Sequence, residues 1–231
     1  MGGGFRNLAL DALFPRFCLS CTREGQIFCS ACLDAWRPVP ELPACPFCRT
    51  VGTNRTCDAC APKTHLDGCL SYLPYGNAVV RGVISAWKYD GDRSVEPVLQ
   101  TWLRQSQEQM RPPMESFTVA SVPVHAARKR MRGFDQAHVL AEWVAELFSA
   151  PAEELLVRTK KTKPQAKMEH EKRKLGTLDG IFAVHPRVVR LPSHVLLCDD
   201  VFTSGATMDA AAACLKRNGV EVVWGMSIGR G

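Results

Sequence analysis

Residues 195–215 read VLLCDDVFTSGATMDAAAACL, and this stretch decides the fold. An apolar run typical of a buried strand ends in two adjacent aspartates, Asp199 and Asp200. A loop of hydroxyl residues around Gly205 follows, and the alanine-rich end of the stretch predicts a helix. Because ligands of α/β proteins bind at the carboxyl ends of the strands, the stretch predicts a binding site together with its scaffold.

The loop TSGAT at 203–207 is suited to an anion, because backbone N–H groups and the positive end of a helix dipole would point at it. Thr203, Ser204 and Thr207 add hydroxyl donors. The preceding carboxylates would repel the same anion, so we expect them to accept hydrogen bonds from two cis hydroxyls of a ribose. A ribose 5-phosphate group fits both halves. The alternative is that the aspartates only cap the helix. The chain has no glycine-rich dinucleotide motif and no Walker A motif.

The chain from residue 67 onward alternates strand-like and helical segments. Strands are predicted at 70–75, 117–124, 155–157, 194–199 and 220–228, and helices at 77–89, 94–110, 134–148 and 206–219. Asn77 is a candidate N-cap, and Gly219 is a candidate helix stop. This alternation predicts an α/β domain over 67–231, a mostly parallel sheet covered by helices on both faces.

Cysteines dominate the first 66 residues. Eight of the eleven form four Cys-x-x-Cys pairs: Cys18/Cys21, Cys29/Cys32, Cys45/Cys48 and Cys57/Cys60. Two such turns offer the four thiolates of a structural zinc site, so we expect a small double zinc-ribbon-like module over 1–66 with one or two zinc ions. Neighbouring and interleaved pairings both fit the spacing. Disulfides would need an oxidising compartment, and an iron–sulfur cluster is the weaker metal alternative.

The net charge of +6 is concentrated in two segments. Residues 158–174 hold eight Lys or Arg and two Glu, and RKRMR at 128–132 adds four more cations. Focused positive charge attracts phosphate on a small molecule or on nucleic acid, although solvated surface is the simpler interpretation. The sequence lacks an apolar run of membrane-spanning length, and its start lacks the apolar core of a signal peptide. We therefore expect a cytoplasmic protein without membrane contact.

The motifs together resemble a known family. The apolar run, the two aspartates and TSGAT are similar to the phosphoribosyl-pyrophosphate (PRPP) motif of type I phosphoribosyltransferases. The segments SVPVHAARKRMRGFDQAHVLA, RTKKTKPQAKMEHEKR and AWKYDGD resemble blocks of the ComF family, phosphoribosyltransferase-like proteins associated with competence. The tandem cysteine pairs belong to the same pattern, so the resemblance covers nearly the whole chain.

The resemblance implies roles for named residues. Asp199 and Asp200 would be catalytic and hold the ribose of PRPP. The 5-phosphate would lie on the loop and its flanks: Val201, Phe202, Thr203, Ser204, Gly205, Ala206 and Thr207. The diphosphate would lie on a second loop with a basic partner: Pro123, Val124, His125 and Arg132. A closing segment would bring four more polar side chains: Arg158, Lys161, Gln165 and Arg173. Mg²⁺ would arrive with PRPP.

Two functions are consistent with this resemblance. The first is a PRPP-binding protein of DNA uptake in natural transformation, with single-stranded DNA or a helicase-type protein of the ComF operon as its partner. The second is a phosphoribosyltransferase acting on an unidentified small-molecule acceptor in metabolism, with no role in DNA uptake. The sequence shows neither a base-binding hood nor a source of ammonia, so the acceptor, and with it enzymatic activity, is left open.

Overall fold

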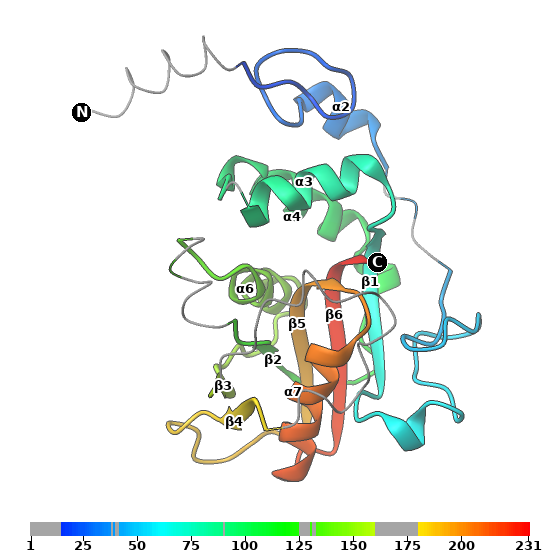
Figure 1. Cartoon of the computed structure of the whole chain (residues 1–231), viewed down its shortest axis with the longest axis vertical. Coiled ribbons are helices and arrows are strands. Elements are labelled where there is room, and N and C mark those ends of the chain that lie inside the picture. The colour runs from blue at the N-terminus through cyan, green and yellow to red at the C-terminus, as the bar shows by residue number, and fades with distance from the viewer. Residues whose placement is uncertain are drawn as a thin grey trace.

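The structure is a computed structural model, and it describes residues 15–37, 39, 42–89, 91–124, 130, 133–159 and 180–231. Its centre is a sheet of four parallel strands in the order β1-β6-β5-β2 (Figure 1). The strands are β1 (Gly68–Pro74), β6 (Val222–Arg230), β5 (His194–Phe202) and β2 (Thr118–Ser121). The predicted fold class, a parallel sheet flanked by helices, is confirmed.

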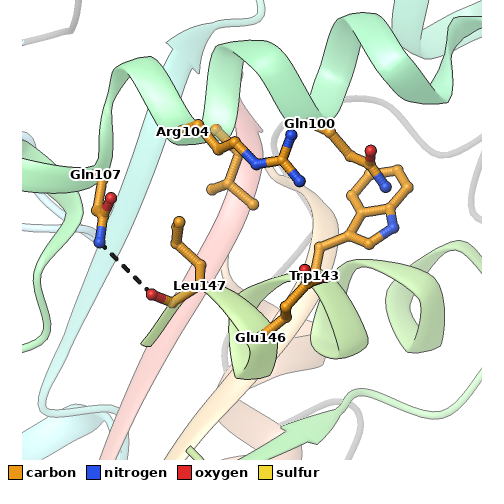
Figure 2. A pocket seen from close by; sticks show the side chains of 7 residues that line it. Gln100, Arg104, Gln107, Trp143, Glu146 and Leu147 are labelled. Carbon is orange, nitrogen blue, oxygen red and sulfur yellow. Dashed lines mark hydrogen bonds between the residues drawn. The ribbon is translucent and has the colours of Figure 1, made fainter. Parts of the chain in front are cut away.

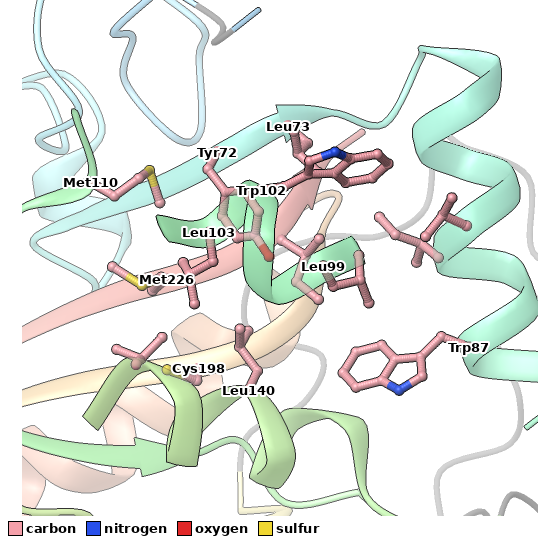
Figure 3. Packing of buried hydrophobic residues seen from close by; sticks show 14 of the residues in the cluster. Tyr72, Leu73, Trp87, Leu99, Trp102, Leu103, Met110, Leu140, Cys198 and Met226 are labelled. Carbon is pink, nitrogen blue, oxygen red and sulfur yellow. The ribbon is translucent and has the colours of Figure 1, made fainter. Parts of the chain in front are cut away.

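Alternation along β5 explains why helices cover both faces of the sheet. Leu196 and Cys198 are buried among α3 (Ala78–Tyr89), α4 (Glu96–Gln105) and α6 (Gln136–Phe148), the cluster shown in Figure 3. Val195 and Leu197 are buried on the opposite face, against α7 (Ala206–Arg217). Successive side chains of a strand point to opposite faces, so an apolar run such as VLLC needs partners on both.

Two predicted segments differ from the structure. The strand expected at 155–157 does not join the parallel sheet: β3 (Leu156–Arg158) pairs antiparallel with β4 (Phe182–Val184), a strand that the sequence did not indicate. The helix expected at 94–110 is divided into η2 (Arg93–Val95), α4 and η3 (Gln107–Met110), both η segments being 3-10 turns. Pro97 lies in the first turn of α4, where a missing N–H costs nothing, which explains why the α-helix starts there.

The N-cap predicted at Asn77 is confirmed, because its side-chain oxygen accepts hydrogen bonds from the N–H groups of Val79 (2.9 Å) and Val80 (3.2 Å). α7 ends at Arg217, two residues before Gly219, which adopts a φ of +97°. The start of α3 and the end of α7 thus follow ordinary capping chemistry.

The cysteine-rich residues contact the α/β core in two separate places (Figure 1). The first segment contains α2 (Ser30–Ala35) and packs on α4, where Phe28 and Trp36 meet Trp102 with ring centroids 5.4 and 4.2 Å away. The second segment ends in η1 (Ala61–Lys63) and lies beside β1 and β6, where the N–H of Cys69 donates to the carbonyl oxygen of Asn54 (2.9 Å). A division of the chain at residue 66 remains a prediction.

Within the described part of the chain, none of the helices combines the length and the apolar character that a membrane span requires.

Candidate functional site

The two aspartates end the apolar part of β5 at the carboxyl edge of the sheet, and a lysine from another element meets them there. Nζ of Lys88, in the last turn of α3, lies 2.8 Å from Oδ1 of Asp200. Both side chains are largely buried, with 13% and 11% of their surface exposed. The N–H of Asp200 donates to Oδ1 of Asp199 (2.8 Å), which turns the first carboxylate toward the strand end. The three groups form a compact cluster of two acids and one base.

The electrostatics of this cluster are unusual. Burial and the neighbouring charge of Asp200 raise the pKa of Asp199 to about 8, although Lys88 opposes the shift. Burial alone would lower the pKa of Lys88, but Asp200 and Asp199 raise it above its ordinary value. Lys88 therefore stays charged at neutral pH, while Asp199 keeps its proton at pH values below about 8. Such a cluster both donates and accepts hydrogen bonds, as recognition of a sugar diol requires.

The loop after β5 leads directly into α7. Gly205 has a φ of +74°, a left-handed conformation that favours glycine, and α7 begins at the next residue. The N–H of Asp209 donates to the carbonyl oxygen of Gly205 (2.8 Å), so the first helical bond starts from the loop itself. The N–H groups of the first helical turn have no intrahelical acceptor and point out of the helix end. Such free N–H groups at a helix N-terminus can donate hydrogen bonds to an anion.

The other sequence-predicted residues are placed as follows. Pro123 and Val124 follow β2, and the N–H of Val122 donates to the carbonyl oxygen of Cys198 (2.9 Å), so this loop starts beside the aspartates. Arg158 lies at the end of β3, with its guanidinium 5.5 Å from the centre of the Phe182 ring. Five predicted site residues lie outside the described residues: His125, Arg132, Lys161, Gln165 and Arg173.

The cysteines form two tetrads of neighbouring pairs, which decides between the pairings that the sequence left open. Within each tetrad the sulfur atoms all lie within 4.8 Å of one another. Four thiolates bound to one zinc at about 2.3 Å lie about 3.8 Å apart. Sγ of Cys21 and Sγ of Cys29 are 3.7 Å apart, and those of Cys48 and Cys57 are 3.5 Å apart. Both tetrads fit a tetrahedral zinc ion. The tetrads are Cys18, Cys21, Cys29, Cys32 and Cys45, Cys48, Cys57, Cys60.

The first turn of each tetrad has the same backbone geometry. Thr22 and Arg49, each four residues after the first cysteine, have left-handed φ values of 59° and 65°. Their N–H groups donate to the carbonyl oxygens of Cys18 (2.8 Å) and Cys45 (3.1 Å). This shared turn presents two thiols to one point, as a zinc knuckle does.

Local hydrogen bonds prepare thiolates in both tetrads. Burial opposes ionisation of Cys18, but N–H groups such as that of Cys29 lower its pKa to about 6. Thr50 and the neighbouring thiols lower the pKa of Cys48 to about 6. Burial and adjacent thiols raise the pKa of Cys60 to about 12. Four crowded thiols that cannot all ionise alone are expected to do so when a cation balances their charge.

A separate pocket of about 220 Å³ lies between α4 and α6, away from the aspartates (Figure 2). Nε2 of Gln107 donates across it to the carbonyl oxygen of Leu147 (3.5 Å). Its lining is Gln100, Leu103, Arg104, Gln107, Trp143, Glu146 and Leu147. The lining mixes charged, polar and apolar side chains from α4, η3 and α6 and contains none of the predicted site residues.

Comparison with known proteins agrees with the sequence motifs. The chain is 27% identical over 183 residues to competence protein ComFC of Bacillus subtilis, a match covering 76% of this chain and 72% of that protein. It is 26% identical to competence protein ComFC of Streptococcus pneumoniae, covering 90% and 89%. It is 24% identical to competence protein F of Haemophilus influenzae, covering 91% and 96%. These similarities, which extend over most of the chain, support membership of the ComF family. No protein-family model matches the chain.

Sequence reasoning missed three residues that lie at or beside the candidate site. Lys88 stands in the AWKYDGD segment, which resembles the family, but a lysine at a helix end carries no signal of a site by itself. Phe47, between two cysteines, lies against the loop: its ring centroid is 6.1 Å from that of Phe202. Arg230, at the end of β6, is only 4% exposed. The last two are revealed only by the fold.

Proposed function

We propose that this chain binds PRPP with Mg²⁺ at the carboxyl edge of the sheet and acts in DNA uptake. The observation that carries the proposal is the cluster of Lys88, Asp200 and Asp199 one loop before the N-terminus of α7. The helix end and loop 203–207 are suited to the 5-phosphate, and the carboxyl groups are suited to the ribose hydroxyls. A ribose 5-phosphate group uses both halves, and the diphosphate of PRPP would extend from it toward the loop at Pro123.

Transfer of the phosphoribosyl group would break the bond between ribose C1 and the diphosphate and form a bond to an acceptor nucleophile. The chain's own contribution would be to hold the ribose through Asp199 and Asp200 and the phosphate through the loop. Mg²⁺ would be bound through the diphosphate and ribose hydroxyls, and it would neutralise charge on the leaving group. The loop that starts at Pro123 is the proposed site for that diphosphate, with His125 and Arg132 continuing it. The acceptor is left open.

The proposed role in DNA uptake rests on the relatives, which are named competence proteins. The basic segments 128–132 and 158–174 are candidate contacts for the phosphates of single-stranded DNA, and a helicase-type motor is a candidate protein partner. The two tetrads are proposed to bind one structural zinc ion each.

A ligand series tests the binding proposal. The unfolding temperature of the protein is measured with Mg²⁺ and PRPP, ribose 5-phosphate, pyrophosphate or inorganic phosphate. PRPP should raise it most, because only PRPP occupies all parts of the site. Equal shifts with pyrophosphate and PRPP would mean that the ribose is not recognised.

Replacement of the gene by one encoding Asp200→Asn tests the cellular role in a host that takes up DNA. The number of transformants should fall well below that of the wild type. Unchanged transformation, together with intact PRPP binding by the wild-type protein, would favour the metabolic alternative.

A further inference from the structure

The second cysteine tetrad contacts loop 203–205, between β5 and α7, through the side chain of Phe47. Phe47 lies between Cys45 and Cys48 in the chain, so a metal bound by these thiols fixes the turn that carries the ring. Its ring meets that of Phe202 edge to face, at 67° and with centroids 6.1 Å apart. Phe202 is 2% exposed and is the last residue of β5 before the loop.

Gly205 shows how closely the loop fits these two rings. A methyl group added at Gly205 would lie 2.5 Å from Cζ of Phe202 and 2.9 Å from Cε1 of Phe47. Such distances are shorter than carbon–carbon contacts allow, so the glycine backbone rests on both rings without spare space. The rings thereby restrict where the loop, and the helix N-terminus after it, can lie.

A second set of contacts joins the turn that carries Phe47 to the carboxyl end of β6. The buried guanidinium of Arg230 donates to the carbonyl oxygens of Cys45 (2.7 Å) and Ala44 (3.4 Å). Next in the chain, the N–H of Gly231 donates to the carbonyl oxygen of Phe202 (2.9 Å), and the guanidinium of Arg49 donates to the carbonyl oxygen of Gly231. The turn at residues 45–49 is thus bonded to the end of β6, which is in turn bonded to Phe202 at the end of β5.

From these contacts we infer that Phe47 is a positioning residue: metal binding by the second tetrad sets the conformation of loop 203–205 through the Phe47 ring and so controls anion affinity. The inference rests on the proposed function for its ligand. The first tetrad serves as an internal comparison, because Phe28, next to Cys29, packs on Trp102 of α4 instead of on the loop.

The test compares Phe47→Ala with Phe28→Ala and Phe47→Tyr in the full chain. Two readouts are used: hydrogen exchange of the Asp209 amide, which donates to the Gly205 carbonyl oxygen, and the dissociation constant for PRPP with Mg²⁺. Zinc content is measured for every variant. Phe47→Ala should keep its zinc, speed exchange at Asp209 at least tenfold and weaken PRPP binding at least tenfold. Phe47→Tyr keeps the ring and should restore both, and Phe28→Ala should change neither.

Removal of the metal gives the second arm. Cys48→Ala with Cys57→Ala should lose one zinc and repeat the Phe47→Ala result, whereas Cys21→Ala with Cys32→Ala should lose one zinc and keep PRPP affinity. If the cysteine variants do not fold, the hydrogen exchange and PRPP affinity of Phe47→Ala decide whether the inference holds.

Two outcomes would overturn the inference. One is unchanged exchange at Asp209 in Phe47→Ala, and the other is faster exchange with unchanged PRPP affinity. If the wild type binds no PRPP, the proposed function fails, and the exchange data still decide whether Phe47 holds the loop.

Discussion

Asp199 holds its proton in the folded protein at pH values where an unfolded chain has lost it. Burial and the charge of Asp200 raise its pKa from 3.8 to about 8. The folded state therefore binds the extra proton between these two values, and this group makes stability fall as pH rises from about 4 to about 8. A destabilising group of this kind is expected where a site is built for a ligand.

We predict that Asp199→Asn is more stable than the wild type at pH 8 by about 1–2 kcal/mol, because an amide has no proton that the folded state must hold and the unfolded chain would release. The difference should vanish near pH 4. Urea unfolding at several pH values measures it. Asp209→Asn is the control, since Asp209 accepts the N–H groups of His65 (2.6 Å) and Leu66 (3.0 Å) and should lose stability when replaced. A less stable Asp199→Asn at pH 8 would contradict the account.

We predict that Lys88 stabilises the folded protein by balancing the negative charge of the Asp199–Asp200 pair. Removing one partner of a largely buried ion pair typically costs about 3–5 kcal/mol, and Lys88→Met should fall in that range. Lys216→Met is the matched control, because its pair with Asp67 (2.7 Å) is about twice as exposed and should cost about 1 kcal/mol or less. Chemical denaturation at pH 7.5 compares the two, and equal losses would remove the special place given to Lys88.

The turn from β5 to α7 depends on one glycine. Gly205→Ala places a side chain in a left-handed conformation and against two aromatic rings, so we predict a loss of about 2–4 kcal/mol. Gly219→Ala controls for the backbone alone: its φ is +97°, and nothing lies within 4 Å of the added carbon. That variant should lose about 1–2 kcal/mol. Thermal unfolding measures both, and equal losses would show that the rings do not confine the loop.

The elements that the sequence predicted are those with strong local patterns. The apolar run of β5, the alternating segments around it and the cap at Asn77 were predictable because burial and capping act within a few residues. β4 is three residues long and has no alternation to detect. The predicted helix began at residue 94, whereas α4 begins at Glu96, with Pro97 in its first turn. Cysteine spacing predicted metal sites but fitted two pairings equally well. The pairing, like the contacts of Phe47 and Lys88, depends on distances between segments far apart in the chain.

The cysteine-rich residues and the sheet are joined by buried polar contacts as well as by apolar packing. Asp209 of α7 accepts hydrogen bonds from the N–H groups of His65 and Leu66, and Arg230 of β6 donates to the carbonyl oxygen of Cys45 in the second tetrad. We predict that residues 67–231 produced alone lack a cooperative unfolding transition, because both buried charges lose these hydrogen bonds. Circular dichroism during urea unfolding measures this. A sharp transition in the fragment would show that the two parts fold independently.

The central claim is that the edge of the sheet at Asp199, Asp200 and loop 203–207 binds PRPP. Calorimetric titration of PRPP with Mg²⁺ into the wild type, Asp200→Asn and Asp34→Asn tests it most directly, Asp34 being an exposed residue of α2. The account predicts saturable binding of one PRPP per chain by the wild type and by Asp34→Asn, and at least tenfold weaker binding by Asp200→Asn. Absence of saturable binding by the wild type, or equal affinity in all three proteins, would contradict it.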